Sequence, residues 1–201
     1  MKNISTLTEC KMPLLAVDNL KANYLASSLI SNGEHLLPQE NIYLKVFIRL
    51  VDKACNEYNS SRELLLEQID EIKNGEERGY RTIFIFGFWD HIENCINAIK
   101  RIYLIFDKII SVRGKLEIDR TERKLIKNHQ TIIKNLRNTV EHIDKELQSI
   151  DTYTISISST QDGVSISSYE IKFISLFNLL RRFNEIGKKW INIYSMTNIL
   201  E

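Results

Sequence analysis

The sequence predicts an all-α protein, an antiparallel helical bundle with a small β-hairpin before its last helix. Apolar residues recur three and four positions apart over long stretches, which is the period of an amphipathic helix. The 201-residue chain has only two prolines and seven glycines, so residues that interrupt helices are scarce. One segment instead alternates apolar and polar residues around an Asp-Gly turn. With 43% hydrophobic residues the chain can bury a core, and we expect a single helical domain over residues 1–201.

The N-terminal third of the chain is expected to form three helices. Their predicted ranges are 14–31, 41–57 and 61–73. Asn32-Gly33 is expected to end the first helix, because Gly is favoured just after the last helical turn. Asn59-Ser60 is expected to separate the second helix from the third.

Two longer helices are expected to form the centre of the bundle. The pattern over residues 79–112 places apolar side chains at helical period for many turns, as Phe88, Ile92, Ile96, Ile99, Ile102, Phe106 and Ile109 show. Gly114 breaks the pattern, and a second long helix follows over 119–148. A short connection makes antiparallel neighbours, so residues 79–148 are expected to form the core hairpin.

A β-hairpin is expected at about 152–168. Residues 152–158 and 164–168 alternate in character on either side of Asp162-Gly163. Their side chains are mostly Ser and Thr, so we expect this hairpin to be exposed. The last helix is expected at about 170–197, with leucines, Phe183 and Trp190 at helical spacing.

Charge is unevenly distributed along the chain. The formal net charge is only +1, which gives no global indication of nucleic-acid binding. Residues 108–137, however, hold nine Lys or Arg against three acidic residues, a local excess of six positive charges. This segment can bind phosphates, or it can simply be a solvated, lysine-rich surface.

The three cysteines, Cys10, Cys55 and Cys95, are far apart and form no CxxC pair, which predicts reduced thiols and a cytoplasmic protein. We expect no signal peptide, no transmembrane helix and no membrane partner, since no long uncharged apolar run occurs. The four histidines lack HxH or HExxH spacing, so neither a metal site nor another cofactor is expected.

The stretch LRNTVEHIDKEL, residues 136–147, is the one place where the sequence offers chemistry. Leu136, Val140, Ile143 and Leu147 form one apolar stripe of the predicted helix. Four polar residues lie on the face away from that stripe: Arg137, Asn138, Glu141 and His142. Such a face is either solvated or covered by a partner.

The arrangement Arg137-Asn138-x3-His142 resembles the Arg-x4–6-His motif of HEPN domains, all-α proteins of bacterial defence and RNA processing. The resemblance covers about residues 79–148, with the flanking helices completing the bundle. It implies a homodimer that acts as a metal-independent endoribonuclease of a defence or toxin–antitoxin system, with RNA and an antitoxin protein as partners. Arg137, Asn138 and His142 are then the catalytic residues.

The chemistry of these side chains suits that role. His142 titrates near neutrality and can take the proton of an RNA 2′-hydroxyl, while Arg137 can stabilise charge on the phosphoryl oxygens. Glu141 and Asp144 are supporting residues whose negative charges would raise the pKa of His142. Asp144 stands where toxins silenced by a nucleotidyltransferase antitoxin carry Tyr, so that mode of control is not expected here.

Two alternatives remain open. The polar face can instead serve a non-catalytic HEPN-like dimeric interaction or RNA-binding module, or the chain can be an unrelated helical protein. Among other candidates, His129 on the apolar stripe is expected to be a hydrogen-bonded core residue. Residues 89–94, WDHIEN, are expected to cap and solvate the start of the long helix, although Asp90, His91 or Asn94 can also support the site.

Overall fold

The structure is a computed structural model that describes residues 9–31, 33–74, 81–141, 157–159 and 162–195. The helices of this part of the chain are α1 (Leu20–Ser28), α2 (Pro38–Lys73), α3 (Arg81–Val112), α4 (Arg120–Lys127), α5 (Gln130–Glu141) and α7 (Phe173–Ser195). The strands are β1 (Ile157–Ser159), β2 (Gly163–Ile166) and β3 (Tyr169–Lys172).

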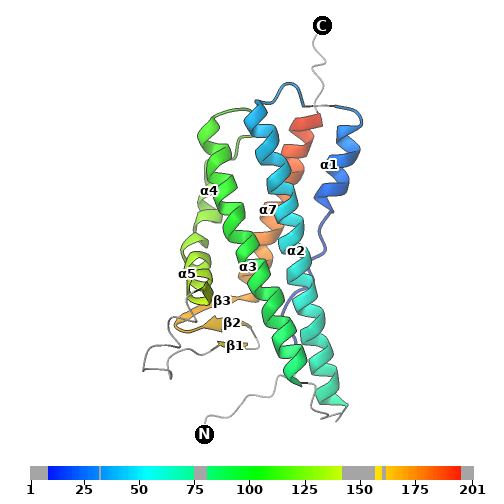
Figure 1. Ribbon diagram of the computed structural model, residues 1–201, viewed down its shortest axis with the longest axis vertical. Coiled ribbons are helices and arrows are strands. Elements are labelled where there is room, and N and C mark those ends of the chain that lie inside the picture. Colours follow the sequence, from blue (N-terminus) through cyan, green and yellow to red (C-terminus); the bar gives the residue numbers. More distant parts are fainter. Residues whose placement is uncertain (1–8, 32, 75–80, 142–156, 160–161, 196–201) are drawn as a thin grey trace.

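The helices form an elongated antiparallel bundle, as predicted. Helices α2 and α3 run side by side along its long axis, and α7 packs against α2 (Figure 1). Helix α1 covers α2 and α7 at one end of the bundle, while the strands lie near the other end. Helices α4 and α5 follow one another along the outer side of the bundle, where α5 packs on α3 and on the sheet.

Helix α2 is one continuous helix, so the predicted break at Asn59-Ser60 is wrong. The side chain of Asn59 instead holds the N-terminal segment: its Oδ1 accepts from the backbone N–H of Leu15 at 3.2 Å, and its Nδ2 donates to the carbonyl of Leu15 at 3.0 Å. Ser61 donates to the carbonyl of Tyr58 within the helix. Asn59, which favours a turn in isolation, here makes a tertiary contact from within the helix.

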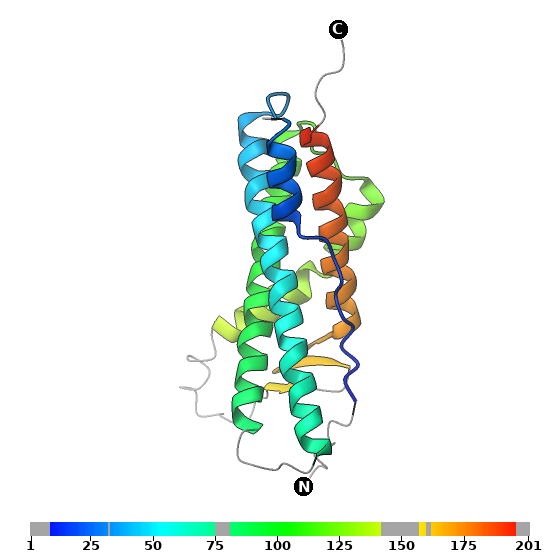
Figure 2. The same cartoon turned by 90° about the vertical axis from the view of Figure 1, so that its right-hand side faces the viewer.

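Helix α1 begins at Leu20 and ends at Ser28, inside the predicted range 14–31. The residues before it run in extended form along the bundle (Figure 2). Met12 is buried there, and its carbonyl accepts from the guanidinium of Arg62 at 2.9 Å. Asp52 of α2 accepts from the first backbone N–H groups of α1, those of Leu20 and Lys21. These tertiary contacts fix the start of the helix.

The single helix predicted over 119–148 is divided into α4 and α5, which corrects that prediction. The backbone N–H of His129 donates to the carbonyl of Ile126, three residues back, and Tyr103 of α3 donates to the same carbonyl at 2.7 Å. Both Ile126 before the break and Ile133 after it are fully buried. The break therefore lets two short helices each bury their apolar side, and residues 142–148 lie outside the described part.

The predicted hairpin is part of a three-stranded antiparallel sheet in the order β1-β2-β3. Strand β3 pairs Ile171 with Val164 and occupies residues assigned by the sequence to the last helix, which begins at Phe173. The second turn lies at Ser167, whose φ is 56°, and it lacks the Gly or Asn that marks such turns. The expectation of an exposed hairpin is also wrong for β2, since Val164 and Ile166 are buried.

The core is one continuous cluster that draws on every described helix. At its centre lies Trp190 of α7, fully buried, with its ring centroid 4.6 Å from that of Phe47 and 6.3 Å from that of Phe106. The three cysteines are free thiols, as predicted. Burial raises the pKa of the Cys55 thiol to about 12, aided by the negative charge of Asp52, so this thiol is held protonated.

Candidate nucleic-acid interface

Helix α5 carries the described part of the predicted site. Its side chains Ile133 and Leu136 are fully buried against α3 and the sheet, and Thr139 is 8% exposed. The hydroxyl of Thr139 donates a hydrogen bond to the carbonyl of Asn135 at 3.0 Å, so this buried hydroxyl has a partner. Arg137 and Asn138 lie beside this stripe and are half-buried. They are neither core residues nor fully solvated ones.

Arg137 belongs to a cluster of positive charge formed between two helices. Partial burial, followed by the nearby positive charges of Arg137 and Lys134, lowers the pKa of Lys100 below its usual 10.5. Lys100 is on α3, whereas Lys134 and Arg137 are one turn apart on α5. We name Lys100, Lys134 and Arg137 the α3–α5 cation cluster. Cations that repel one another in this way gain most from a bound anion.

The structure does not test the predicted pairing of these residues with the histidine. His142 and Asp144 lie outside the described residues. Glu141 is the last residue of α5, and its side chain also lies outside the description. The predicted catalytic roles of Arg137, Asn138 and His142 therefore stay predictions.

The other histidines are placed differently from what the sequence suggested. His91 binds Glu57 of α2, with 2.7 Å between Nδ1 and Oε2, so it links α3 to α2 rather than supporting α5. Asp90 and Asn94 are exposed on α3. His129 lies at the break between α4 and α5, and its buried Nδ1 has no hydrogen-bond partner among the described residues, contrary to the expectation of a hydrogen-bonded core histidine.

A second basic surface lies on α4. Four cations at positions i, i+3, i+4 and i+7 share one face of this helix: Arg120, Arg123, Lys124 and Lys127. We name them the α4 basic face. Together with Asn128 they line a hollow of about 380 Å³. The sequence indicated an excess of charge in this region, and the helical spacing of the cations was the signal that would have located it.

Comparison of the chain with protein-family models, with curated proteins and with solved structures gave no match. Within the described residues, no group of three or more His, Cys, Asp and Glu side chains is arranged to hold a metal ion. None of the described helices combines the length and the apolar character needed to cross a membrane. Among the described residues, the cations of α3, α4 and α5 are the features that indicate a function.

Proposed function

We propose that this chain is a HEPN-like RNA-binding protein that cleaves RNA without a metal ion, at Arg137, Asn138 and His142. The α3–α5 cation cluster is the observation that carries the proposal. Three positive side chains from two helices gather beside Asn138, and the pKa of Lys100 is lowered by its two cationic neighbours. Closely spaced cations suit the phosphates of an RNA backbone, and Arg offers a planar, permanent set of donors for a phosphoryl group.

In the proposed reaction, the imidazole of His142 takes the proton of an RNA 2′-hydroxyl, and the 2′-oxygen attacks the adjacent phosphorus. A new bond joins the 2′-oxygen to phosphorus, and the bond from phosphorus to the 5′-oxygen breaks. The leaving 5′-oxygen gains a proton from solvent. The products are a 2′,3′-cyclic phosphate and a free 5′-hydroxyl. Arg137 stabilises the charge on the phosphoryl oxygens, and Asn138 positions the phosphate or the imidazole ring.

The test is cleavage of total RNA by the purified full chain in EDTA. Wild type is expected to cut and to leave cyclic-phosphate ends, whereas His142→Ala and Arg137→Ala are expected to lose about 100-fold or more in rate, the usual contribution of a general base or a charge-stabilising donor. Arg49→Gln, an exposed cation on α2, serves as the control and should cut like wild type. Equal cutting by all four proteins would show that the site is assigned wrongly.

The second candidate is a non-catalytic dimeric module, and exposed apolar side chains favour it. Phe86 and Leu104 on α3 are 64% and 60% exposed, and their spacing of about five full turns places them on the same face of the helix, where a second copy could cover both. This candidate predicts that RNA is never cut and that Arg137→Ala weakens self-association. A sizing column run beside a thermal melt distinguishes loss of the dimer from loss of the fold.

Our proposal also includes a biological setting, which is a bacterial defence or toxin–antitoxin system with a homodimeric toxin and an antitoxin protein. Expression of wild type is then expected to arrest growth, and His142→Ala is expected to relieve the arrest. Equal toxicity of the two proteins at equal abundance would contradict this setting.

A further inference from the structure

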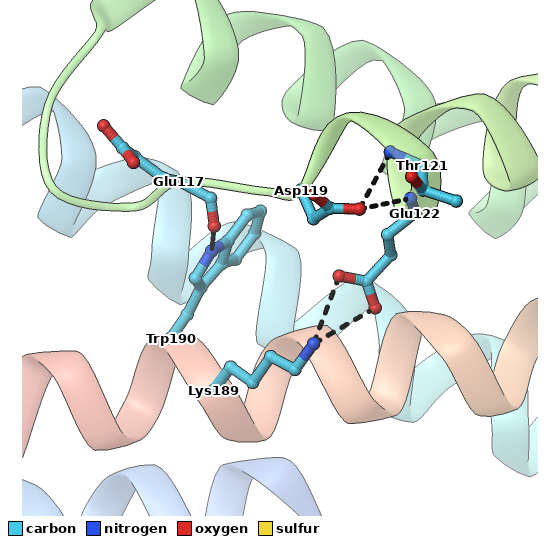
Figure 3. A network of polar contacts seen from close by, with 6 residues as sticks. All are labelled: Glu117, Asp119, Thr121, Glu122, Lys189 and Trp190. Carbon is cyan, nitrogen blue, oxygen red and sulfur yellow. Dashed lines mark hydrogen bonds and ion pairs between the residues drawn. The ribbon is translucent and has the colours of Figure 1, made fainter.

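The side of α4 that carries Glu122, opposite the basic face on the helix, is held to α7 (Figure 3). Asp119 caps α4, accepting from the backbone N–H of Thr121 at 2.8 Å and from that of Glu122 at 3.3 Å. The carboxylate of Glu122 then pairs with Lys189 of α7 at 3.2 Å. The acidic residue of this helix is thus turned toward the bundle and does not neutralise the basic face.

The connection that leads into α4 is fixed just as firmly. Trp190 donates its indole N–H to the carbonyl of Glu117 at 3.3 Å (Figure 3). The buried carboxylate of Glu40 accepts from the backbone N–H of Leu116 at 2.8 Å and from that of Leu37 at 3.0 Å. A helix of eight residues is too short to be stable alone, so these contacts set its position.

The four cations of the basic face are poorly compensated by acids. Arg120 and Lys124 stand four residues apart, as do Arg123 and Lys127, and like charges at this spacing destabilise a helix. Lys127 pairs with Asp107 of α3 at 3.2 Å. The other three cations form no ion pair with any described residue. A bound polyanion would supply the missing negative charge.

A second hollow adjoins the basic face and differs in character. It measures about 320 Å³ and shares Arg123 with the first hollow. Its lining is mixed, with the apolar side chains of Ile109, Ile110, Leu116 and Ile118 beside the charged Arg113 and Glu117. A cationic surface beside a hollow of mixed lining fits a nucleotide, since the phosphates contact the cations and an unpaired base can pack on isoleucine side chains and on the guanidinium of an arginine.

We propose that the α4 basic face binds the backbone of single-stranded RNA and that the hollow beside it accepts an unpaired base. The inference rests on the proposed function in taking RNA as the ligand, and it extends the binding surface from the α3–α5 cation cluster along α4. A membrane surface is disfavoured, because an interfacial helix needs a broad exposed apolar side, and α4 offers only Leu125, 39% exposed, while Ile126 is fully buried.

The experiment measures binding of a labelled single-stranded RNA of about 12 nucleotides, with 2′-O-methyl riboses throughout. Such RNA lacks the attacking hydroxyl, so binding is measured apart from cleavage. The double variant Arg120→Gln/Lys124→Gln is compared with Arg49→Gln/Lys53→Gln. Both remove one exposed Arg and one exposed Lys four residues apart on a helix, and the second pair is on α2. The matched pairs separate the position of the charge from its total amount.

The α4 variant is expected to bind about tenfold more weakly than wild type. Its plot of log K against log salt should be less steep by about 1.4, the value for two lost phosphate contacts on a single strand. The α2 variant should stay within twofold of wild type, and wild type should prefer the single strand to a duplex of equal length. Equal weakening by both variants, or a preference for the duplex, would overturn the inference.

Two further outcomes separate this inference from the proposed function. If wild type cuts unmodified RNA but the α4 variant binds like the α2 control, the α4 inference fails and the nuclease proposal stands. If binding depends on α4 and no RNA is ever cut, the binding face stands and the nuclease proposal fails. Binding of the α4 face to phosphatidylserine vesicles but not to RNA would assign the face to a membrane and refute the inference.

Discussion

The α2–α3 hairpin and the α4–α5 segment use their polar residues in opposite ways. Helices α2 and α3 have 36 and 32 residues, and their polar side chains form cross-links within the molecule. Asp52 holds the start of α1, Asn59 holds the N-terminal segment, and Glu57 pairs with His91. Helices α4 and α5 have only 8 and 12 residues, and their Lys and Arg side chains are exposed or half-buried at the surface.

This difference separates scaffold from binding surface. In the hairpin, the buried or half-buried side chains of Asp52, Asn59 and Glu57 each have a partner inside the protein, which helps to fix the fold. On α4 and α5, cations lie near other cations, and a bound anion would lower this repulsion. The position of α4 also depends on contacts from outside it, above all those of Trp190 on α7 and Glu40 on α2.

The largest effect is expected for Trp190→Ala, which removes the fully buried centre of the core and the hydrogen bond to the carbonyl of Glu117. Truncation of a buried Trp costs about 3–5 kcal/mol, so the free energy of unfolding should fall by that amount. Urea denaturation measures it. Phe86→Ala, at an exposed position of α3, should change the free energy of unfolding by less than about 0.5 kcal/mol. A small effect of Trp190→Ala would mean that α7 is not the centre of the scaffold.

An intermediate effect is expected for Asp52→Ala. Asp52 is 5% exposed and accepts from the backbone N–H of Leu20 at 3.0 Å and of Lys21 at 2.8 Å. Loss of such a cap should lower the free energy of unfolding by about 1–2 kcal/mol. Asn19→Ala removes the local, exposed cap that accepts from Ala22 and should cost less, about 0.5–1 kcal/mol. Urea titrations of the two variants compare a tertiary cap with a local one, and the reverse order would mean that the local cap, not Asp52, fixes the start of α1.

The smallest effect, and one of opposite sign, is expected for Lys100→Gln. The pKa of Lys100 is lowered below 10.5 in the folded state, so between the two pKa values the unfolded state binds more protons. Stability contributed by this group therefore rises as pH increases through that window. Replacement should remove the rise and should slightly raise the free energy of unfolding at pH 7, because the repulsion from Arg137 and Lys134 is lost.

The measurement for Lys100→Gln is a pair of urea titrations, at pH 7 and near pH 10, with Lys53→Gln as an exposed control on α2. The same Lys100 variant should bind RNA more weakly, so greater stability would accompany weaker binding. A variant that is less stable at pH 7 would show that Lys100 is a structural residue rather than part of a binding surface.

The candidate site was foreseeable from the sequence only where it lies on one helix. Arg137 and Asn138 lie beside the buried stripe of α5, as their spacing from Leu136 predicts. Lys100 was not foreseeable, because it reaches the cluster from α3 across a helix–helix contact. The helical spacing of Arg120, Arg123, Lys124 and Lys127 is visible in the sequence. The sequence does not show that Glu122 is turned toward Lys189 and so leaves the first three cations without an ion pair among the described residues.

The sequence by itself determined the helical class, the long α3, and the turn at Asp162-Gly163 between the first two strands, because these follow from side-chain period and local backbone preference. Tertiary structure alone decided that α2 continues past Asn59, that the helix is interrupted between α4 and α5 just before His129, and that the apolar side chains of β2 are buried. In each case a distant group supplies the missing partner: Leu15 for the amide of Asn59, Tyr103 for the carbonyl of Ile126, and α5 and α7 for the apolar side chains of β2. The helix and turn propensities of single residues contribute less free energy than these tertiary contacts. The contacts therefore set where the helices and strands begin and end.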